Sequence, residues 1–269
     1  MIIIETISFK NIEDYPSNYN TNNHYEKKPD NYDEYISLFD TKYWIDKIHS
    51  YQKITIQKKD ISWLYECLEY GNLYRKFPSN YLEELDDLIY QYPQLKKDNY
   101  FVRTDKTSLK SGIYGIGPYT NLKDIIISMT TTRFGHHAFN KTDSEINLYL
   151  LKYKKIDMDK EFRVFVVDNK ISLISQQNIY KKNNYLPTIN IENFINHIDE
   201  YFNQSIKDKL LDYKNYIMDI VYLEDTHEFY FIEINPFGKE YTSGSGCFHW
   251  INDNDIIYDT NNITFRYVN

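Results

Sequence analysis

The sequence predicts an α+β fold, a mixed and largely antiparallel sheet with helices around it. Short runs rich in aromatic and β-branched residues recur through the second half of the chain, as strands require. Apolar residues at three- and four-residue steps dominate part of the first half, as helices require. No internal repeat is visible, and separate blocks of helices and strands are typical of the α+β class.

Composition limits the kinds of protein this chain can be. Its 269 residues, 42% of them hydrophobic, suffice for one large domain or two intimate lobes. A formal net charge of −8 argues against a general nucleic-acid surface and against binding to an anionic membrane. No apolar run approaches the ~18 residues of a membrane span, and two cysteines make no disulfide framework. We therefore expect a cytoplasmic protein.

The first half is expected to be mainly helical. Residues 1–9 predict a short strand, and the polar residues 11–30 predict a loop. Helical spacing follows over 33–49. Asp60 is expected to cap a helix over 61–70 that ends at Gly71. The last helix of this half is expected over 81–91, where Asn80 and Glu83 resemble a capping box.

The second half is expected to supply most of the sheet. Asn121 is expected to open an amphipathic helix, and another helix is expected over 190–202. The expected strands are 99–104, 146–153, 161–167, 171–177, 215–223 and 228–235.

The last hairpin carries the first candidate site. If its turn is centred on Thr226, Asp219 lies opposite Glu233, and two opposed carboxylates in apolar surroundings repel each other. Strand alternation places Phe229, Phe231, Glu233 and Asn235 on one face. Asp219, Glu233 and the Asn235 amide oxygen form an all-oxygen set that suits Mg²⁺. Ordinary strand carboxylates, one of them facing solvent, are the alternative that spacing leaves open.

A second candidate site lies on the hairpin formed by 161–167 and 171–177. Glu161 and Arg163 share a strand face, and a guanidinium held by a carboxylate can bind phosphate. A three-residue turn centred on Asn169 adds Ser175 and Gln177 to that face. A two-residue Asp168-Asn169 turn would place them on the other face. A surface ion pair between Glu161 and Arg163 is the alternative.

Two glycine-rich segments are weaker signals. Arg103 and Lys110 flank a loop that contains Gly112, Gly115 and Gly117, where backbone could approach phosphate, although this signal alone favours a plain turn. The segment 243–246, Ser-Gly-Ser-Gly, lacks the pattern of a nucleophile elbow, and we expect a flexible loop there.

Three late motifs together resemble a known family. The segments EFRVFVVDNKISLISQQNIY, MDIVY and FIEINPFG are similar, in order and approximate spacing, to motifs of the cell division cycle protein 123 family. A weaker match extends upstream through LYLLKY to FVRTDKTSLKSG. The resemblance implies one ATP-grasp-like unit with a nucleotide cleft between two lobes, about 1–145 (the first lobe proper from about 99) and 146–269.

The resemblance also implies roles for individual residues. Asp219, Glu233 and Asn235 fall on the family's metal positions, with Glu233 in place of the usual Asp. The implied nucleotide-binding residues are Arg103 and Lys110, the hinge-strand residues Leu151, Lys152 and Lys154, and Glu161, Arg163 and Gln177. Gln177 replaces an Arg of the family, so one phosphate contact would be missing or supplied elsewhere.

The implied function is an assembly chaperone that binds ATP and Mg²⁺. Members of the family promote assembly of eukaryotic translation initiation factor 2 and bind its gamma subunit, which is the implied partner. The alternative is an ATP-grasp enzyme, a ligase or phosphotransferase, with Arg133, His136 and His137 as candidate acceptor contacts. The residues do not imply hydrolysis, since no general base is evident beyond the metal carboxylates.

Overall fold

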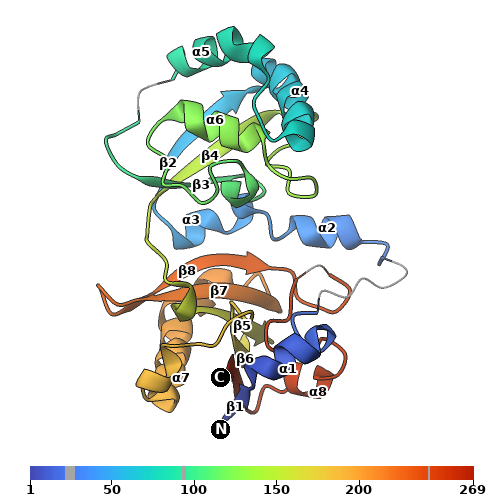
Figure 1. The fold of residues 1–269 in the computed structure, drawn as a ribbon, viewed down its shortest axis with the longest axis vertical. Coiled ribbons are helices and arrows are strands. Elements are labelled where there is room, and N and C mark those ends of the chain that lie inside the picture. Colours follow the sequence, from blue (N-terminus) through green and yellow to red (C-terminus); the bar gives the residue numbers. More distant parts are fainter. Residues whose placement is uncertain (22–27, 93–94, 242) are drawn as a thin grey trace. The chain divides into compact units, whose positions relative to one another are not determined.

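The computed structural model describes residues 1–21, 28–92, 95–241 and 243–269. The chain forms two compact units. One, here called the discontinuous unit, combines residues 1–39 with 156–269, and the other, the continuous unit, is residues 40–155. Each unit has its own sheet and helices (Figure 1), as an α+β fold requires.

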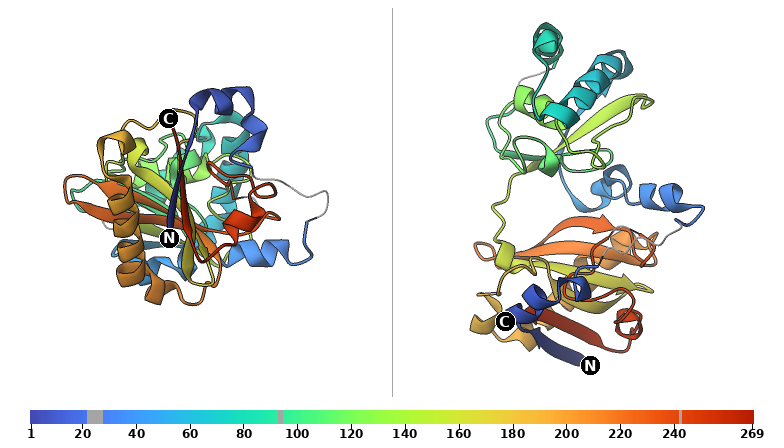
Figure 2. Two further views of the ribbon diagram at one scale, coloured as in Figure 1. Left: turned by 90° about the horizontal axis from the view of Figure 1, so that it is seen from below. Right: turned by 45° about the vertical axis from the view of Figure 1, so that its right-hand side comes forward.

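The discontinuous unit is built on a six-stranded sheet of order β1-β9-β6-β5-β7-β8. Parallel pairing joins β9 to both β1 and β6, and the remaining pairs are antiparallel. Figures 1 and 2 show β1 and β9, from opposite ends of the chain, side by side. The strands are β1 Ile2–Ile7, β5 Glu161–Val167, β6 Lys170–Gln176, β7 Tyr216–Leu223, β8 Glu228–Asn235 and β9 Ile263–Val268.

Both faces of this sheet are covered. On one face lies α7 (Ile191–Tyr201), opened by Asn190, whose side chain accepts a hydrogen bond from the Asn193 N–H at 2.9 Å. Phe194 of this helix packs against Phe162 of β5, with ring centroids 5.2 Å apart. The other face carries an apolar cluster that includes Phe165, Ile217, Phe237, Phe248 and Trp250. The short helices of this unit are α1 Phe9–Asp14, α2 Tyr32–Ser37 and α8 Asn254–Ile257.

The continuous unit has a three-stranded antiparallel sheet of order β2-β4-β3, with β4 in the centre. Helices α4 and α6 pack together beside it (Figure 1). Asn121 opens α6 as expected, because its side chain accepts a hydrogen bond from the Asp124 N–H at 2.8 Å. The elements are α3 Ile45–Ile48, β2 Gln52–Gln57, α4 Lys58–Tyr74, α5 Leu82–Tyr90, β3 Tyr100–Thr104, α6 Leu122–Thr130 and β4 Glu145–Lys152.

The structure differs from the expected helices in the first half. The expected helix over 33–49 is split into α2 and α3, because Asp40 adopts φ −55° and ψ 142°, which is not helical. The helix expected over 61–70 is longer, since α4 continues through Gly71 and ends at Arg75, which is left-handed with φ 53°. Asp60 lies inside this helix, so its expected capping role is wrong.

The expected loop at 11–30 is only partly observed. Residues 22–27 lie outside the described residues, and α1 and a 3₁₀ turn at Pro16–Asn18 occupy part of the rest. Strands β2 and β9 were not expected. The first 39 residues belong to the same unit as the C-terminal part, because β1 pairs with β9.

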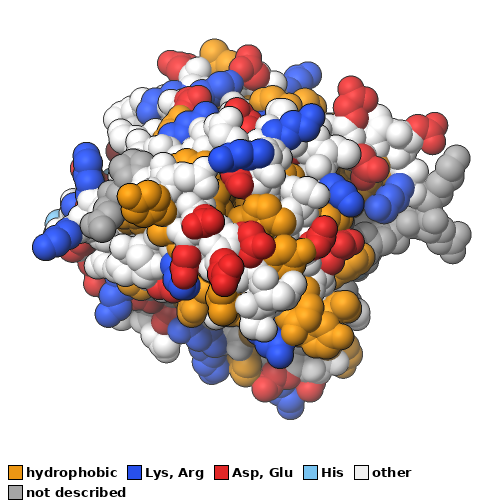
Figure 3. Space-filling model, turned by 90° about the horizontal axis from the view of Figure 1, so that it is seen from above, with side chains coloured by type: hydrophobic (Ala, Val, Ile, Leu, Met, Phe, Trp, Pro, Cys, Tyr) orange, Lys and Arg blue, Asp and Glu red, His pale blue; other side chains and the backbone are white. Residues whose placement is uncertain are grey.

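Acidic side chains gather at the α5 end of the continuous unit (Figure 3). The exposed acidic residues of α5 are Glu83, Glu84, Asp86 and Asp87. Among the described residues, no helix has the length and apolar character needed to cross a bilayer. Both cysteines, Cys67 and Cys247, are free and buried.

Candidate functional site

The carboxylates of the last hairpin are opposed as the sequence predicts. Asp219 of β7 pairs with Glu233 of β8. The turn, however, spans residues 224–227, since Leu223 pairs with Glu228, and a β-bulge at Ile232 shifts the register by one residue. The bulge also corrects an expectation about faces. Strand alternation is interrupted at Ile232, so Glu233 and Asn235 do not share a face with Phe229 and Phe231.

Asp219 is the buried centre of the site, with only 1% of its surface exposed. Arg163 of β5 lies opposite it and donates two hydrogen bonds to its carboxylate, from Nε to Oδ1 at 2.9 Å and from Nη2 to Oδ2 at 2.8 Å. Asn235 Nδ2 donates a third to Oδ2 at 3.0 Å. Three of the four acceptor positions of this carboxylate are therefore used within the chain.

Electrostatics explain why a buried guanidinium remains charged here. Burial alone lowers the pKa of Arg163, but the hydrogen-bonded Asp219 outweighs it, and Glu233 and Glu161 add to the effect, so the pKa is raised above its usual value. Three carboxylates thus act on one guanidinium.

The β5-β6 hairpin reaches its predicted register by an unexpected route. The turn is the two-residue Asp168-Asn169 type, with φ 48° and 58°. A bulge then leaves Ser172 without a strand partner, which restores the register of the three-residue alternative, with Arg163 opposite Ser175. The Gln177 N–H donates to the Glu161 carbonyl at 3.0 Å.

The segment 243–246 is anchored, contrary to the expectation of a flexible loop. Arg163 Nη1 donates to the Gly244 carbonyl oxygen at 2.7 Å, and Trp250 Nε1 donates to that of Ser243 at 2.8 Å. The Ser245 hydroxyl is buried and accepts the Thr21 N–H at 2.9 Å. The sequence could not indicate these contacts, because their partners are distant along the chain. Arg163 and Gly244 are 81 positions apart, and Thr21 and Ser245 are 224 positions apart.

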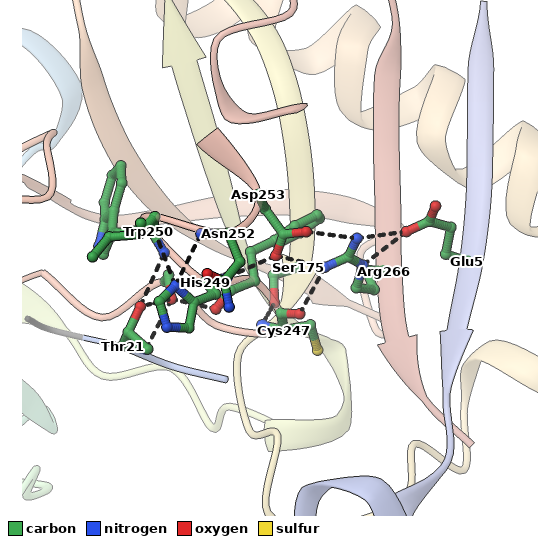
Figure 4. A network of polar contacts seen from close by, with 12 residues as sticks. Glu5, Thr21, Ser175, Cys247, His249, Trp250, Asn252, Asp253 and Arg266 are labelled. Carbon is green, nitrogen blue, oxygen red and sulfur yellow. Dashed lines mark hydrogen bonds and ion pairs between the residues drawn. The ribbon is translucent and has the colours of Figure 1, made fainter. Parts of the chain in front are cut away.

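A second polar network supports the same segment (Figure 4). Ser175 accepts the Cys247 N–H at 2.8 Å. Arg266 of β9 donates to Asp253 at 2.9 Å and to Glu5 of β1 at 2.8 Å, and its guanidinium lies over the Phe248 ring, 4.2 Å from the centroid. These contacts hold the chain that follows β8 against β6 and β9.

The donor chemistry at Asp219, Glu233 and Asn235 fits Mg²⁺. Mg²⁺ is bound in proteins by one or two carboxylates together with water and phosphate oxygens, and Asp219 and Glu233 are two opposed carboxylates of this kind. The Asn235 amide presents nitrogen to Asp219, and a half-turn of the amide would present its oxygen instead. Within the described ranges, no cluster of three or more His, Cys, Asp or Glu side chains is arranged to hold a metal, so the set depends on the amide.

The other expected site residues lie in the continuous unit. Arg103 of β3 is buried, 3% exposed, and lies 5.1 Å from the Trp44 ring centroid. Lys110 is exposed in a 3₁₀ turn at Leu109–Ser111. Leu151 is buried on β4, Lys152 is exposed at its end, and Lys154 follows the strand. Pairing with β2 stops at Leu150, so only β3 pairs with β4 at Leu151 and Lys152.

The structure therefore brings together six of the expected site residues in the discontinuous unit. They are Glu161, Arg163, Gln177, Asp219, Glu233 and Asn235. An Arg, two strand carboxylates and an amide on three adjacent strands define the class of protein, an α+β fold with a candidate magnesium site on its larger sheet.

Comparison with known proteins gives the family. The family model described as D123 matches residues 123–269, and the chain belongs to this family. A translation initiation factor eIF2 assembly protein from Vanderwaltozyma polyspora is 29% identical over 111 residues, which are 38% of this chain and 29% of that protein. The chain thus matches less than a third of the length of this relative.

Two structures of Cdc123 from Schizosaccharomyces pombe share the fold. The first aligns with a TM-score of 0.55 at 12% identity, and the second, a C-terminally truncated form, with 0.58 at 13% identity. Each alignment covers 87% of this chain and 97% of the other. The expected family and the expected α+β fold class are confirmed.

Proposed function

We propose that this protein binds ATP with Mg²⁺ and assists the assembly of eukaryotic translation initiation factor 2. Membership of the D123 family and the relative named as an eIF2 assembly protein support the biological role. The observation that carries the nucleotide part is the register of the last hairpin, which opposes Asp219 and Glu233 beside Asn235.

In this proposal Asp219, Glu233 and Asn235 hold Mg²⁺, which would neutralise the phosphates of ATP. The two hydrogen bonds from Arg163 to Asp219 form one bidentate interaction that fixes the carboxylate. A third hydrogen bond, from Arg163 Nη1, fixes the Gly244 backbone. Arg163 therefore orders the metal site and has little remaining capacity for phosphate, which modifies the phosphate-binding role expected from the sequence. In the same proposal Glu161 and Gln177 border the site. Glu161 is on the same strand as Arg163, and its carbonyl oxygen accepts a hydrogen bond from the Gln177 N–H.

The adenine base is proposed to bind along the end of β4. Because pairing with β2 ends at Leu150, the backbone groups of Lys152, which point away from β3, are proposed to form hydrogen bonds to the base, with Leu151 beside them. Lys152 and Lys154 lie beside this backbone, and Lys110 and Arg103 are the proposed cationic contacts of the same unit. The proposed partner is the gamma subunit of the initiation factor.

Substitution of Glu233 by Gln tests the metal site. The change keeps the size of the side chain but removes one of the two opposed charges, so we expect Mg²⁺-dependent stabilisation by ATP to be lost while stability without ligand is retained. A ligand at 100 times its dissociation constant stabilises the native state by about 2.7 kcal/mol. The measurement is the melting temperature with ATP·Mg²⁺ and with ATP plus EDTA.

Glu228→Gln is the matched control, because Glu228 is an exposed carboxylate on the same strand. It should retain the full shift in melting temperature. Absence of any shift in the wild type would overturn nucleotide binding. The assembly role is tested separately with purified gamma subunit: failure of the two proteins to co-elute, with the nucleotide shift intact, would overturn that role alone.

A further inference from the structure

Three segments of the continuous unit meet at the C-terminal end of α4. Arg75 ends this helix, and its guanidinium donates to the carbonyl oxygens of Thr131 and, at 2.8 Å, Ser111. The Ile113 N–H donates to the Thr131 hydroxyl at 3.2 Å, and the Arg133 N–H donates to the Ser111 hydroxyl at 3.4 Å. Residues 70–76, 110–116 and 131–137 are thereby joined, and we call them the apolar–basic surface.

Large apolar side chains of this surface are exposed, although the unit has a well-filled core. Hydrophobic groups gathered on a surface mark interaction sites more often than scattered ones do. The exposed fractions are 77% for Leu73, 60% for Tyr74, 38% for Ile113, 46% for Tyr114, 49% for Ile116 and 86% for Phe134.

The charges of this surface have one sign. Its three segments contain Arg75, Lys76, Lys110 and Arg133 and no Asp or Glu, within a chain of net charge −8. Acidic residues of the same unit are concentrated elsewhere, notably on α5. A ligand complementary to such a surface combines negative charge with apolar groups.

We propose that the apolar–basic surface binds an acidic segment of another protein that also carries apolar side chains. Tyr, Phe and Arg are side-chain types that concentrate binding energy at protein interfaces. Nucleic acid fits less well, because the aliphatic side chains Leu73, Ile113 and Ile116 offer no ring for base stacking.

The proposed surface is separate from the proposed metal site, and Lys110 is the residue that it shares with the proposed nucleotide contacts. It shares no residue with Asp219, Glu233 and Asn235, which belong to the discontinuous unit. Substitution of Phe134, which has no assigned role in nucleotide or acceptor binding, should therefore leave the ATP·Mg²⁺ shift in melting temperature unchanged, so that failure of one proposal does not affect the other.

The test uses a phage-displayed library of random 16-residue peptides, selected on the 269-residue chain. We expect the enriched peptides to combine Asp or Glu with Leu, Phe or Trp. The best peptide, labelled with fluorescein, is then titrated by fluorescence anisotropy. Phe134→Ser should weaken its binding about tenfold or more, as at an interface hot spot. Arg133→Glu should weaken binding as well, and added salt should lower the affinity of the wild type.

Two variants are matched controls. Tyr90→Ser removes an aromatic side chain that is 92% exposed on α5, and Lys209→Glu reverses an exposed charge in the other unit. Both should bind the peptide like the wild type. Because all four substituted side chains are exposed, circular dichroism and melting temperature should show that each variant is folded.

Four outcomes would overturn the proposal. Two concern the peptides: the selection yields peptides without acidic residues, or Phe134→Ser binds the selected peptide as tightly as the wild type does. Two concern other ligands: the wild type binds labelled oligo-dT, or it dimerises in sedimentation velocity, and Phe134→Ser abolishes that binding or that dimerisation. The last two would assign the surface to nucleic acid or to a second copy of the chain.

Discussion

At the scale of single residues, Arg163 decides the geometry of the candidate site. Its guanidinium is buried, satisfies the Asp219 carboxylate and also binds the backbone at Gly244. Both charges are removed from water, so each depends on the other for compensation. This dependence means that Asp219 has a structural role beside its proposed role in metal binding.

Arg163→Met should therefore lower the free energy of unfolding by about 3–5 kcal/mol, because it leaves a buried carboxylate without its partner. The measurement is urea denaturation at neutral pH without nucleotide. The double variant Arg163→Met/Asp219→Leu removes both charges and should recover part of the loss. If the single variant is as stable as the wild type, Asp219 finds compensation elsewhere and the buried pair is not the organising feature.

At the scale of elements, close approach of backbones explains why a glycine lies inside a helix. Gly71 is in α4, where an alanine would ordinarily be preferred. A Cβ atom at this position would lie 2.1 Å from the Thr130 carbonyl oxygen. The glycine therefore marks the contact of α4 with the end of α6 and not a helix terminus, which is why the sequence-based boundary was wrong.

Gly71→Ala should consequently destabilise the protein, by about 1–3 kcal/mol, although the same change in an open helix would be stabilising. Glu69→Ala, at an exposed position of the same helix, is the control and should change stability by less than about 0.5 kcal/mol. Thermal denaturation followed by circular dichroism measures both. A rise in melting temperature for Gly71→Ala would show that the helices separate easily.

At the scale of the whole molecule, the two units have separate sheets and separate apolar cores. Both ends of the chain contribute to one sheet, because β1 pairs with β9 in parallel. Arg266 of β9 binds Glu5 of β1 and Asp253 together. The edge of the larger sheet therefore depends on residues 1–7.

Deletion of residues 1–7 should perturb the discontinuous unit selectively. Backbone amides of β9 would lose a strand partner and exchange hydrogen faster, whereas those of β2, β3 and β4 should keep their protection. Hydrogen–deuterium exchange with mass spectrometry, compared with the full chain, measures this. If the deletion accelerates hydrogen exchange equally throughout the chain, the conclusion that each unit is stabilised by its own core would be wrong.

Much of the fold and of the site was predictable because the signals are local. Alternation and aromatic content placed β5, β7 and β8 almost at their observed bounds, and asparagine capping placed the start of α6. The opposition of Asp219 and Glu233 was also predicted. Strands β2 and β9 were missed because they are short and partly polar, and their partners lie about 90 residues or more away along the chain.

The sequence by itself determined the family, the fold class and the set of acidic and amide side chains of the candidate metal site. It did so because motifs and periodicity depend on neighbouring residues. Only the tertiary structure decided that Asp219 holds Arg163 and that bulges at Ser172 and Ile232 set both registers. Which carboxylate pairs with a buried cation, and where a strand takes up an extra residue, depend on strands far apart in the chain.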